Sequence, residues 1–233
     1  MYLTWDEKTI TEFADMHIES MYDMGYVFTR IGKGNMQQTR SLRIELKKFE
    51  LSSENKRILK KTDNLTLTVH DLESGNFEYK WGMAKLAKDF YDRFGEKTFS
   101  ANKAKELLTK PSKSNFNLLL DYSLGYAICF ANKNILHYAY PFYTLSGKVT
   151  KNIKDMGLGM MIRAIVWAKE NKKKYIYLGS ASRPSDTYKL QFSGLEWFTL
   201  SDLSRVSSRE VEGLGNNGVW NNDTSKLKPL LKA

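Results

Sequence analysis

The stretch FNLLLDYSLGYAICFANKNILHYAYPFY, residues 116–143, decides the fold. It holds three runs rich in apolar and aromatic residues, at 116–123, 125–132 and 135–143. Because only one or two residues separate these runs, they are predicted to be strands of an antiparallel meander. Apolar residues at helical spacing then predict a helix over 157–173, and the apolar segment 174–180 predicts a buried strand directly after it.

A meander followed by a helix and a strand is the core order of the GNAT acyltransferase fold. The first half shows a similar run of elements. Helices are predicted at 10–24, 53–61, 83–94 and 101–109, and further strands at 26–31, 40–50, 65–72, 76–81 and within 188–200. We therefore predict an α+β protein with a GNAT-like fold: two GNAT-like lobes, each with a mixed, largely antiparallel sheet flanked by helices. This analogy of fold does not by itself name a reaction.

The polar stretch KPSKSN at 110–115 is the best candidate for a link between the two lobes. We expect an N-terminal GNAT-like lobe over 1–112, which holds a basic block, and a C-terminal GNAT-like lobe over 113–212. The Gly- and Asn-rich end, 213–233, is expected to be a flexible tail.

The charge of the chain favours a polyanionic partner. Its 233 residues include 36 Lys and Arg against 26 Asp and Glu, a net charge of +10, and the pI is about 9.4. The block 47–61 (KKFELSSENKRILKK) carries six cations and two acids, 6 − 2 = +4, enough to neutralise several phosphates. Nucleic acid is the simplest such partner; the alternative is a solvated lysine surface.

Several functional classes are not expected. A single cysteine, Cys129, excludes a disulfide framework, and three scattered histidines make a metal site improbable. No apolar run approaches the ~20 residues of a membrane span, and the N-terminus lacks a secretory pattern. We expect a cytoplasmic protein without a membrane partner, a metal or a bound cofactor. No G-x-S-x-G motif or other nucleophile arrangement is visible.

Two local motifs have both a functional and a structural interpretation. In DMGLGM (155–160), Gly157 and Gly159 are predicted to open a helix and offer backbone N–H groups to a pyrophosphate. Alternatively, they allow close packing against the sheet. The aromatic residues Tyr138, Tyr140 and Phe142 can line a pocket or fill the core. Beside them, His137 is a candidate base or a structural histidine.

Four blocks of the sequence resemble the arginyl/leucyl-tRNA–protein transferase family. They are IESMYDMGYVFTR (18–30), LRIELKKFELSSENKRILKK (42–61), ILHYAYPFYTL (135–145), and GLGMMIRAIVWAKENKKKYIYLG (157–179) with YKLQF (188–192). In the second block, Arg43, Phe49, Ser52, Arg57 and Leu59 match the family pattern. The blocks occur in the family's order and together span roughly residues 18–200.

The chain also departs from that family. Met36 and Thr39 stand where the family carries a cysteine pair, and the other N-terminal cysteines are absent. Glu54 replaces the second serine of the basic block. The segment Ser180–Ser182 replaces a Y-W-I motif, so the amino-acid or acceptor pocket is expected to differ.

The resemblance implies an enzyme that moves an amino acid, with arginine favoured over leucine, from charged tRNA to the N-terminal α-amine of a protein. Aminoacyl-tRNA would be its co-substrate, and the acceptor protein its second partner; the oligomeric state is left open. Residues implied to bind tRNA are Lys47, Lys48, Lys56, Arg57, Lys60 and Lys61. Residues implied to bind substrate are Arg40, Arg43, Tyr138, Tyr140, Phe142, Gly157, Gly159 and Phe192, and the catalytic candidates are Tyr188, Lys189 and His137.

Three alternatives stay open at this stage. One is an acyl-CoA-dependent GNAT N-acetyltransferase, which the glycine pair would serve. Another is an aminoacyl-tRNA-dependent ligase that acts on a small molecule or a cell-wall peptide. The third is a non-catalytic tRNA-binding relative that has lost the family's cysteine layer.

Overall fold

The computed structural model describes residues 3–95, 99–145, 153–200 and 218–231. The chain forms two compact units, each of which takes segments from both halves of the sequence. Unit 1 comprises 1–50, 132–137 and 173–233; unit 2 comprises 51–131 and 138–172. The division into lobes at 1–112 and 113–212 stays a prediction.

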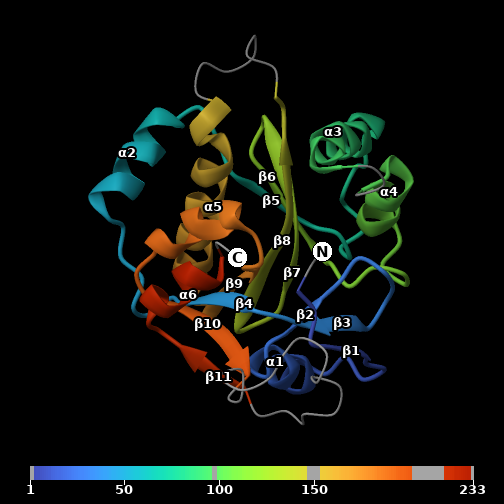
Figure 1. Ribbon diagram of the computed structural model, residues 1–233. Coiled ribbons are helices and arrows are strands. Elements are labelled where there is room, and N and C mark those ends of the chain that lie inside the picture. Colours follow the sequence, from blue (N-terminus) through green and yellow to red (C-terminus); the bar gives the residue numbers. More distant parts are fainter. Residues whose placement is uncertain (1–2, 96–98, 146–152, 201–217, 232–233) are drawn as a thin grey trace. The chain divides into compact units, whose positions relative to one another are not determined.

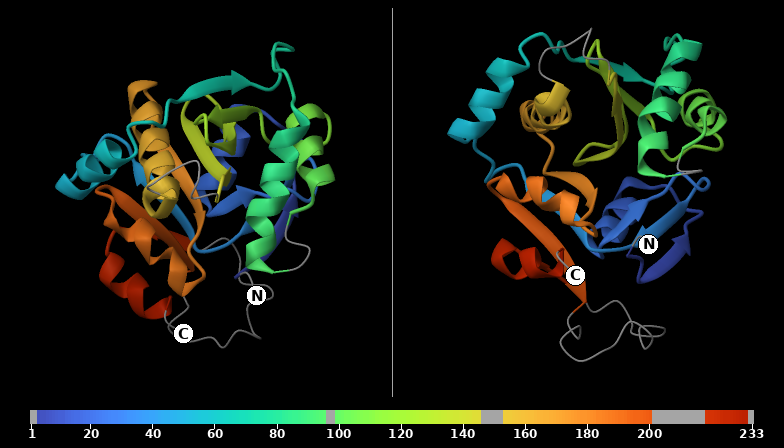
Figure 2. Two further views of the ribbon diagram at one scale, coloured as in Figure 1. Left: turned by 90° about the horizontal axis from the view of Figure 1, so that it is seen from above. Right: turned by 45° about the horizontal axis from the view of Figure 1, so that its top comes forward.

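Unit 2 contains a small sheet with helices on both of its faces. Its strands are β5 (Thr68–Asp71), β6 (Leu118–Asp121), β7 (Gly125–Ala131) and most of β8 (Ile135–Tyr143). Its helices are α2 (Ser53–Lys61), α3 (Trp81–Tyr91), the 3-10 turn η1 (Asp92–Phe94), α4 (Ala101–Thr109) and α5 (Ile153–Glu170). Helices α2 and α5 lie on one side of the strands, and α3 and α4 lie on the other (Figures 1 and 2).

The strands of unit 2 are consecutive neighbours, as a meander requires. β5 pairs antiparallel with β6, β6 pairs antiparallel with β7, and β8 lies beside β7. Leu119 and Leu120 in β6 and Ala127 and Ile128 in β7 are fully buried, so both faces of these strands are covered.

Helices α2 and α5 pack tightly against one another. Ser52 caps α2: its hydroxyl accepts from the Asn55 N–H at 3.1 Å, and the Asn55 amide accepts from the Ser52 N–H at 3.3 Å. At the other end, Arg163 from α5 donates to the carbonyl of Thr62 and, at 2.9 Å, to its hydroxyl. A Cβ on Gly159 would lie 2.4 Å from the Thr62 hydroxyl, so glycine is what allows this approach.

Unit 1 contains two sheets. Helix α1 (Asp15–Asp23) leads into a three-stranded sheet of order β1-β3-β2, with β1 (Asp6–Thr9), β2 (Tyr26–Phe28) and β3 (Asn35–Gln38). The second sheet has the order β11-β10-β4-β9, and the first residues of β8 follow β9. Its strands are β4 (Ser41–Glu45), β9 (Tyr175–Ser180), β10 (Leu195–Leu200) and β11 (Gly218–Asn221). The 3-10 helix η2 (Pro184–Gln191) precedes β10, and α6 (Thr224–Leu230) follows β11.

The structure confirms the α+β class and the order of elements that predicted a GNAT-like fold. A meander, β6-β7-β8, is followed by helix α5 and strand β9. β8 and β9 run parallel, with Ile135 opposite Tyr175 and His137 opposite Tyr177. The other strand pairs of unit 1 are antiparallel, so the architecture is mixed and largely antiparallel, as predicted.

Several local predictions are wrong. Residues 76–81 form no strand, because β5 pairs only with β6 among the described residues. Residues 188–191 belong to η2, which Pro184 starts, rather than to a strand. The tail predicted to be flexible contains β11, paired with β10, and helix α6; residues 213–217 lie outside the described residues.

Helix α5 begins at Ile153, earlier than predicted. Gly157 and Gly159 therefore lie inside the helix, where backbone N–H groups already bond to preceding carbonyls. The prediction that these two glycines open the helix is wrong. Gly157 packs instead against the ring of Tyr143. A Cβ added to Gly157 would lie 3.1 Å from that ring.

Candidate functional site

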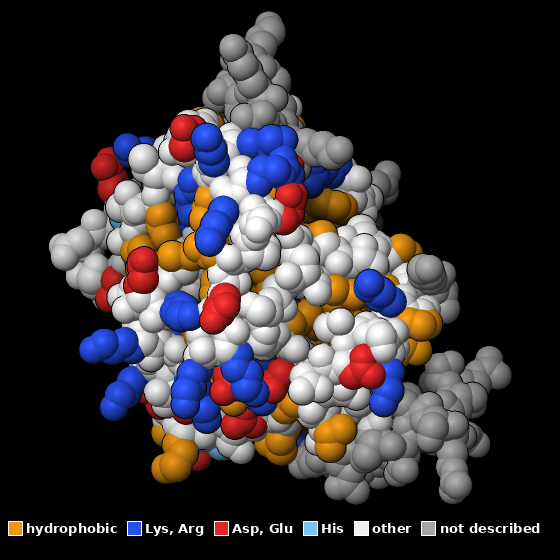
Figure 3. Space-filling view, turned by 90° about the vertical axis from the view of Figure 1, so that its left-hand side faces the viewer, with side chains coloured by type: hydrophobic (Ala, Val, Ile, Leu, Met, Phe, Trp, Pro, Cys, Tyr) orange, Lys and Arg blue, Asp and Glu red, His pale blue; other side chains and the backbone are white. Residues whose placement is uncertain are grey.

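The cations of α2 divide into paired and unpaired ones. The buried face of the helix carries Asn55 and Ile58, which leaves the cations in solvent (Figure 3). Arg57 pairs with Glu54 one turn earlier, and Lys61 lies 3.5 Å from Asp155 of α5.

Lys56 and Lys60 are exposed and form no ion pair with any described residue. Their i, i+4 spacing places both on one face of α2. Lysine head groups so arranged are available to phosphate groups, and Lys60 lies in the last turn of the helix, where the dipole stabilises positive charge.

The remaining two members of the predicted tRNA set belong to the other unit. Lys47 and Lys48 follow β4 in unit 1 and are both exposed. Lys48 pairs with Glu45 on the same turn. The six cations of the predicted block are thus distributed over two structural units.

Arg43, a predicted substrate-binding residue, is buried and pairs with two carboxylates within unit 1. Its Nε donates to Glu196 at 2.7 Å, and its Nη1 donates to Asp23 at 2.8 Å. The guanidinium carbon also lies 4.0 Å from the ring centres of both Tyr175 and Trp220. An incoming carboxylate would have to displace one of these partners, so the geometry favours a structural role.

Arg40 has weaker partners. Its Nη1 lies 3.4 Å from the carbonyl oxygens of Ala181 and Leu230, and its buried Nε has no hydrogen-bond partner among the described residues. Burial lowers the pKa of this guanidinium. Arg40 therefore keeps donor capacity that a ligand can use, and its assignment to the substrate stays a prediction.

The catalytic candidates lie in different environments. Lys189 is buried, bonds to the Ser180 carbonyl at 3.0 Å, and pairs with Asp186 at 3.1 Å. Burial lowers the pKa of Lys189, and the Asp186 carboxylate opposes that shift. Tyr188 is 42% exposed.

His137 is buried, and its Nδ1 lies 2.9 Å from the hydroxyl of Tyr22. Burial, with a smaller contribution from the Lys189 cation, lowers the pKa of His137 to about 3. Such an imidazole is neutral and a weak base at neutral pH. This favours the structural interpretation of His137.

The aromatic residues of β8 fill the core of unit 2. Tyr138 and Phe142 are 2% and 0% exposed. Tyr140 stacks on Phe99 with 5.5 Å between ring centres and meets Phe116 edge-on. These contacts favour the core alternative over a ligand pocket; their assignment to substrate stays a prediction.

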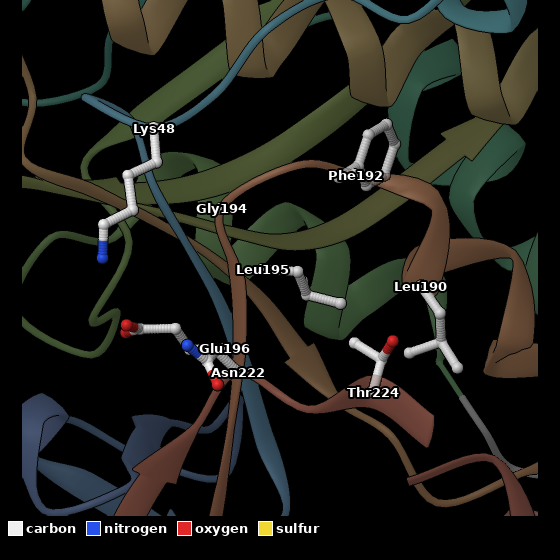
Figure 4. Close-up of a pocket in the computed structure, with 8 residues that line it drawn as sticks. All are labelled: Lys48, Leu190, Phe192, Gly194, Leu195, Glu196, Asn222 and Thr224. Atoms are coloured by element: carbon white, nitrogen blue, oxygen red, sulfur yellow. The ribbon is translucent and has the colours of Figure 1, made fainter. Parts of the chain in front are cut away.

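A pocket of about 290 Å³ opens within unit 1 (Figure 4). One part of its wall is apolar, formed by Leu190, Phe192, Gly194 and Leu195, from the end of η2 to the start of β10. The other part is polar, formed by Lys48, Glu196, Asn222 and Thr224. Phe192 is buried and packs on Phe49, with 6.4 Å between ring centres.

The pocket contains two of the predicted site residues, Lys48 and Phe192. Sequence reasoning missed Glu196 and Asn222. Glu196 is an ordinary polar position on an alternating strand, and Asn222 lies in a segment expected to be flexible. Only the pairing of β10 with β4 and β11 brings these residues together, and no local motif marks that pairing.

The described ranges contain no group of three or more His, Cys, Asp or Glu side chains that could hold a metal ion. Within the same ranges, every helix is too short or too polar to cross a bilayer. Burial raises the pKa of the Cys129 thiol in β7, which makes it unreactive.

Comparisons with known proteins give structural likeness only. No protein-family model matches the chain, and no curated protein sequence does. A GCN5-related glucosamine N-acetyltransferase region of a fungal multi-domain β-N-acetylglucosaminidase superposes with a TM-score of 0.43 at 6% identity, over 84% of this chain and 23% of that one.

Two other solved structures give similarly low TM-scores. The C-terminal domain of a lysylphosphatidylglycerol synthetase from Agrobacterium fabrum gives a TM-score of 0.42 at 12% identity, over 72% of this chain and 52% of that one. L-PGS from Bacillus licheniformis gives a TM-score of 0.39 at 13% identity, over 70% of this chain and 49% of that one. The chain thus spans about half or less of each of these proteins, and likeness this distant carries no functional argument.

Proposed function

We propose that this chain is an aminoacyltransferase that moves an amino acid from charged tRNA to the N-terminal α-amine of a protein. Helix α2 carries the proposal. Its Lys56 and Lys60 are exposed, lie on one face and have no ion pair within the described residues. The GNAT-like order of β6, β7, β8, α5 and β9 and the resemblance of four sequence blocks to the arginyl/leucyl-tRNA–protein transferase family support it.

Such a transfer does not depend on reactive side chains of the protein. The aminoacyl ester is already activated, and a protein α-amine has a pKa of about 7.7–8.0, so a substantial fraction is neutral near pH 7.5. Alignment of amine and ester, with backbone N–H groups directed at the developing oxyanion, supplies the rate. A nucleophilic side chain is not required, which agrees with the unreactive Cys129 and the weakly basic His137.

Label transfer tests the proposal. The protein is incubated with tRNA charged with radiolabelled arginine or leucine and with peptides that begin with Asp, Glu, Arg or Lys. Label is expected on a peptide, and it identifies donor and acceptor together. The matched control is the same peptide with an acetylated N-terminus, which has no free α-amine and should stay unlabelled.

Two results would contradict this function. If charged tRNA binds to the chain but no peptide becomes labelled, the chain binds tRNA without transferring its amino acid to protein. Transfer of a labelled acetyl group from acetyl-CoA, with no response to aminoacyl-tRNA, would establish the acyl-CoA-dependent GNAT alternative instead.

A further inference from the structure

We infer that the start of α3 and the end of α4, in unit 2, form a surface that binds a single-stranded nucleic acid. One base stacks on Trp81, and lysines around it hold the phosphates. This binding goes beyond the proposed function and does not depend on it, because neither helix α2 nor the transfer of an amino acid takes part. Three observations support it: an exposed tryptophan, an excess of lysines beside it, and the separation of both from α2.

Trp81, the first residue of α3, is 68% exposed. It is the most exposed tryptophan of the chain, since Trp197 is buried and Trp5, Trp167 and Trp220 are half-buried. Within the described ranges its indole contacts no other aromatic ring and no cation. A large apolar ring left in water is unusual, and a ring with an open face is what stacks an unpaired base.

Helices α3 and α4 lie side by side in an antiparallel arrangement (Figure 1). The ring of Tyr91, the last residue of α3, lies 5.0 Å from that of Phe99, just before α4. At the other end of the pair, Lys105 Nζ from α4 lies 5.9 Å from the ring centre of Tyr79, two residues before Trp81. The end of α4 is thus brought to the start of α3.

This end of the helix pair has an excess of positive charge. Residues 78–81 and 103–113 contain five lysines and two glutamates, 5 − 2 = +3. Lys80 and Lys105 are exposed, and neither forms an ion pair with a described residue. Such an excess attracts an anionic ligand.

The carboxylate of α4 does not neutralise the lysines around it. Glu106 is bound by Lys103 at 2.5 Å. That hydrogen bond lowers the pKa of Glu106, and the charges of Lys113 and Lys110 add to the shift. Three lysines therefore face one carboxylate, and the surplus charge is available to phosphate groups.

This chemistry favours a nucleic acid over a protein or a lipid surface. Lysine is depleted at protein–protein interfaces, whereas interfaces with nucleic acid are strongly positive. Within 76–91 and 101–113, Trp81 is the one large apolar side chain that is exposed, so no apolar patch of the kind that a protein or a bilayer covers is present there. Because a paired base is already stacked in its duplex, the ligand is single-stranded.

The surface around Trp81 is separate from α2. In unit 2, α3 and α4 lie on one side of the strands, and α2 and α5 lie on the other (Figures 1 and 2). A short oligonucleotide stacked on Trp81 therefore does not reach Lys56 or Lys60. The cations of α2 are thus an internal control for the experiment.

Binding of fluorescein-labelled pentauridylate to the full chain at low salt, followed by fluorescence anisotropy, tests the inference. We expect saturable binding, with quenching of the intrinsic tryptophan fluorescence. Trp81→Ala should weaken binding about tenfold, because the stacked ring is lost. Trp81→Phe keeps an aromatic ring and should weaken it less. Both changes are at an exposed position, so the fold should be kept.

The lysines are tested through the salt dependence of the same binding. With Lys105→Gln and Lys110→Gln together, the plot of log K against log salt concentration should become less steep by about 1.4, which corresponds to the loss of two phosphate contacts of a single strand. The matched control is Lys85→Gln with Lys88→Gln on α3. Each of these lysines is paired with an aspartate, so the slope should stay as in the wild type.

Several results would overturn the inference. They are the absence of saturable binding, equal affinity of Trp81→Ala and the wild type, and equal slopes for the two double lysine variants. An equal affinity for labelled pentaglutamate would show that charge alone is recognised, which also overturns it. So would a tenfold loss of binding in the variant Lys56→Gln, Lys60→Gln, because it would place the oligonucleotide on α2. Pentauridylate binding without label transfer would contradict only the proposed function.

Discussion

Arg43 in β4 and Arg57 in α2 come from the same sequence block, 42–61, yet one is buried and the other is exposed. Arg43 is 7% exposed, bonds to two carboxylates and lies between two aromatic rings. Arg57 is exposed and pairs with Glu54 on its own helix. A count of charges cannot separate these cases, because one cation holds the core of unit 1 together and the other lies in solvent.

Replacing each arginine by methionine should show the largest difference. Arg43→Met leaves the Glu196 carboxylate, 17% exposed, without its partner and removes both ring contacts. We expect a loss of about 3 kcal/mol in the free energy of unfolding. Arg57→Met is the matched control and should leave the midpoint unchanged, because surface pairs contribute little.

Urea unfolding of both variants measures the difference. A comparable loss in the two variants would show that burial does not distinguish the arginines. A stable Arg43→Met protein would show that the ion pairs of Arg43 are dispensable and would reopen its assignment to substrate.

A second buried residue, His137, predicts that the stability of the protein depends on pH. Burial lowers the pKa of His137 to about 3, whereas an unfolded histidine has a pKa of about 6.5. The unfolded state therefore binds more protons below pH 6.5, so stability is complete above that pH and falls as the pH decreases toward 3. From pH 7.5 to 5.5 the expected loss is on the order of 1 kcal/mol.

Unfolding titrations at several pH values test this contribution. His137→Gln should be less stable at pH 7.5, because it loses the bond to Tyr22, but its stability should decrease less steeply between pH 7.5 and 5.5. The slope is the decisive quantity. The same slope in both proteins would assign the pH dependence to other groups.

Local signals in the sequence predicted the elements well where a cap or a clear periodicity exists. Ser52 begins the helix it was predicted to cap, and the helix predicted at 101–109 has those bounds. β8 spans the predicted residues 135–143. In these segments, short-range chemistry determines the structure.

Long-range pairing was not predictable. β1 and β3 are polar and short, and they are strands because β1 pairs with β3 and β3 pairs with β2. β11 depends on β10 in the same way. The pocket follows from these pairings, so the sequence indicated Lys48 and Phe192 but not Glu196 or Asn222.

The assignment of α2 to RNA depends on its two unpaired lysines, and the salt dependence of tRNA binding tests it most directly. The double variant Lys56→Gln, Lys60→Gln should leave stability unchanged. The plot of log K for tRNA binding against log salt concentration should become less steep by about 1.4–1.8, which corresponds to the loss of two phosphate contacts. Lys85→Gln with Lys88→Gln is the control: it removes the same charge from α3, where each lysine lies beside an aspartate. Its slope should match the wild type. Equal slopes for the two double variants would contradict the account.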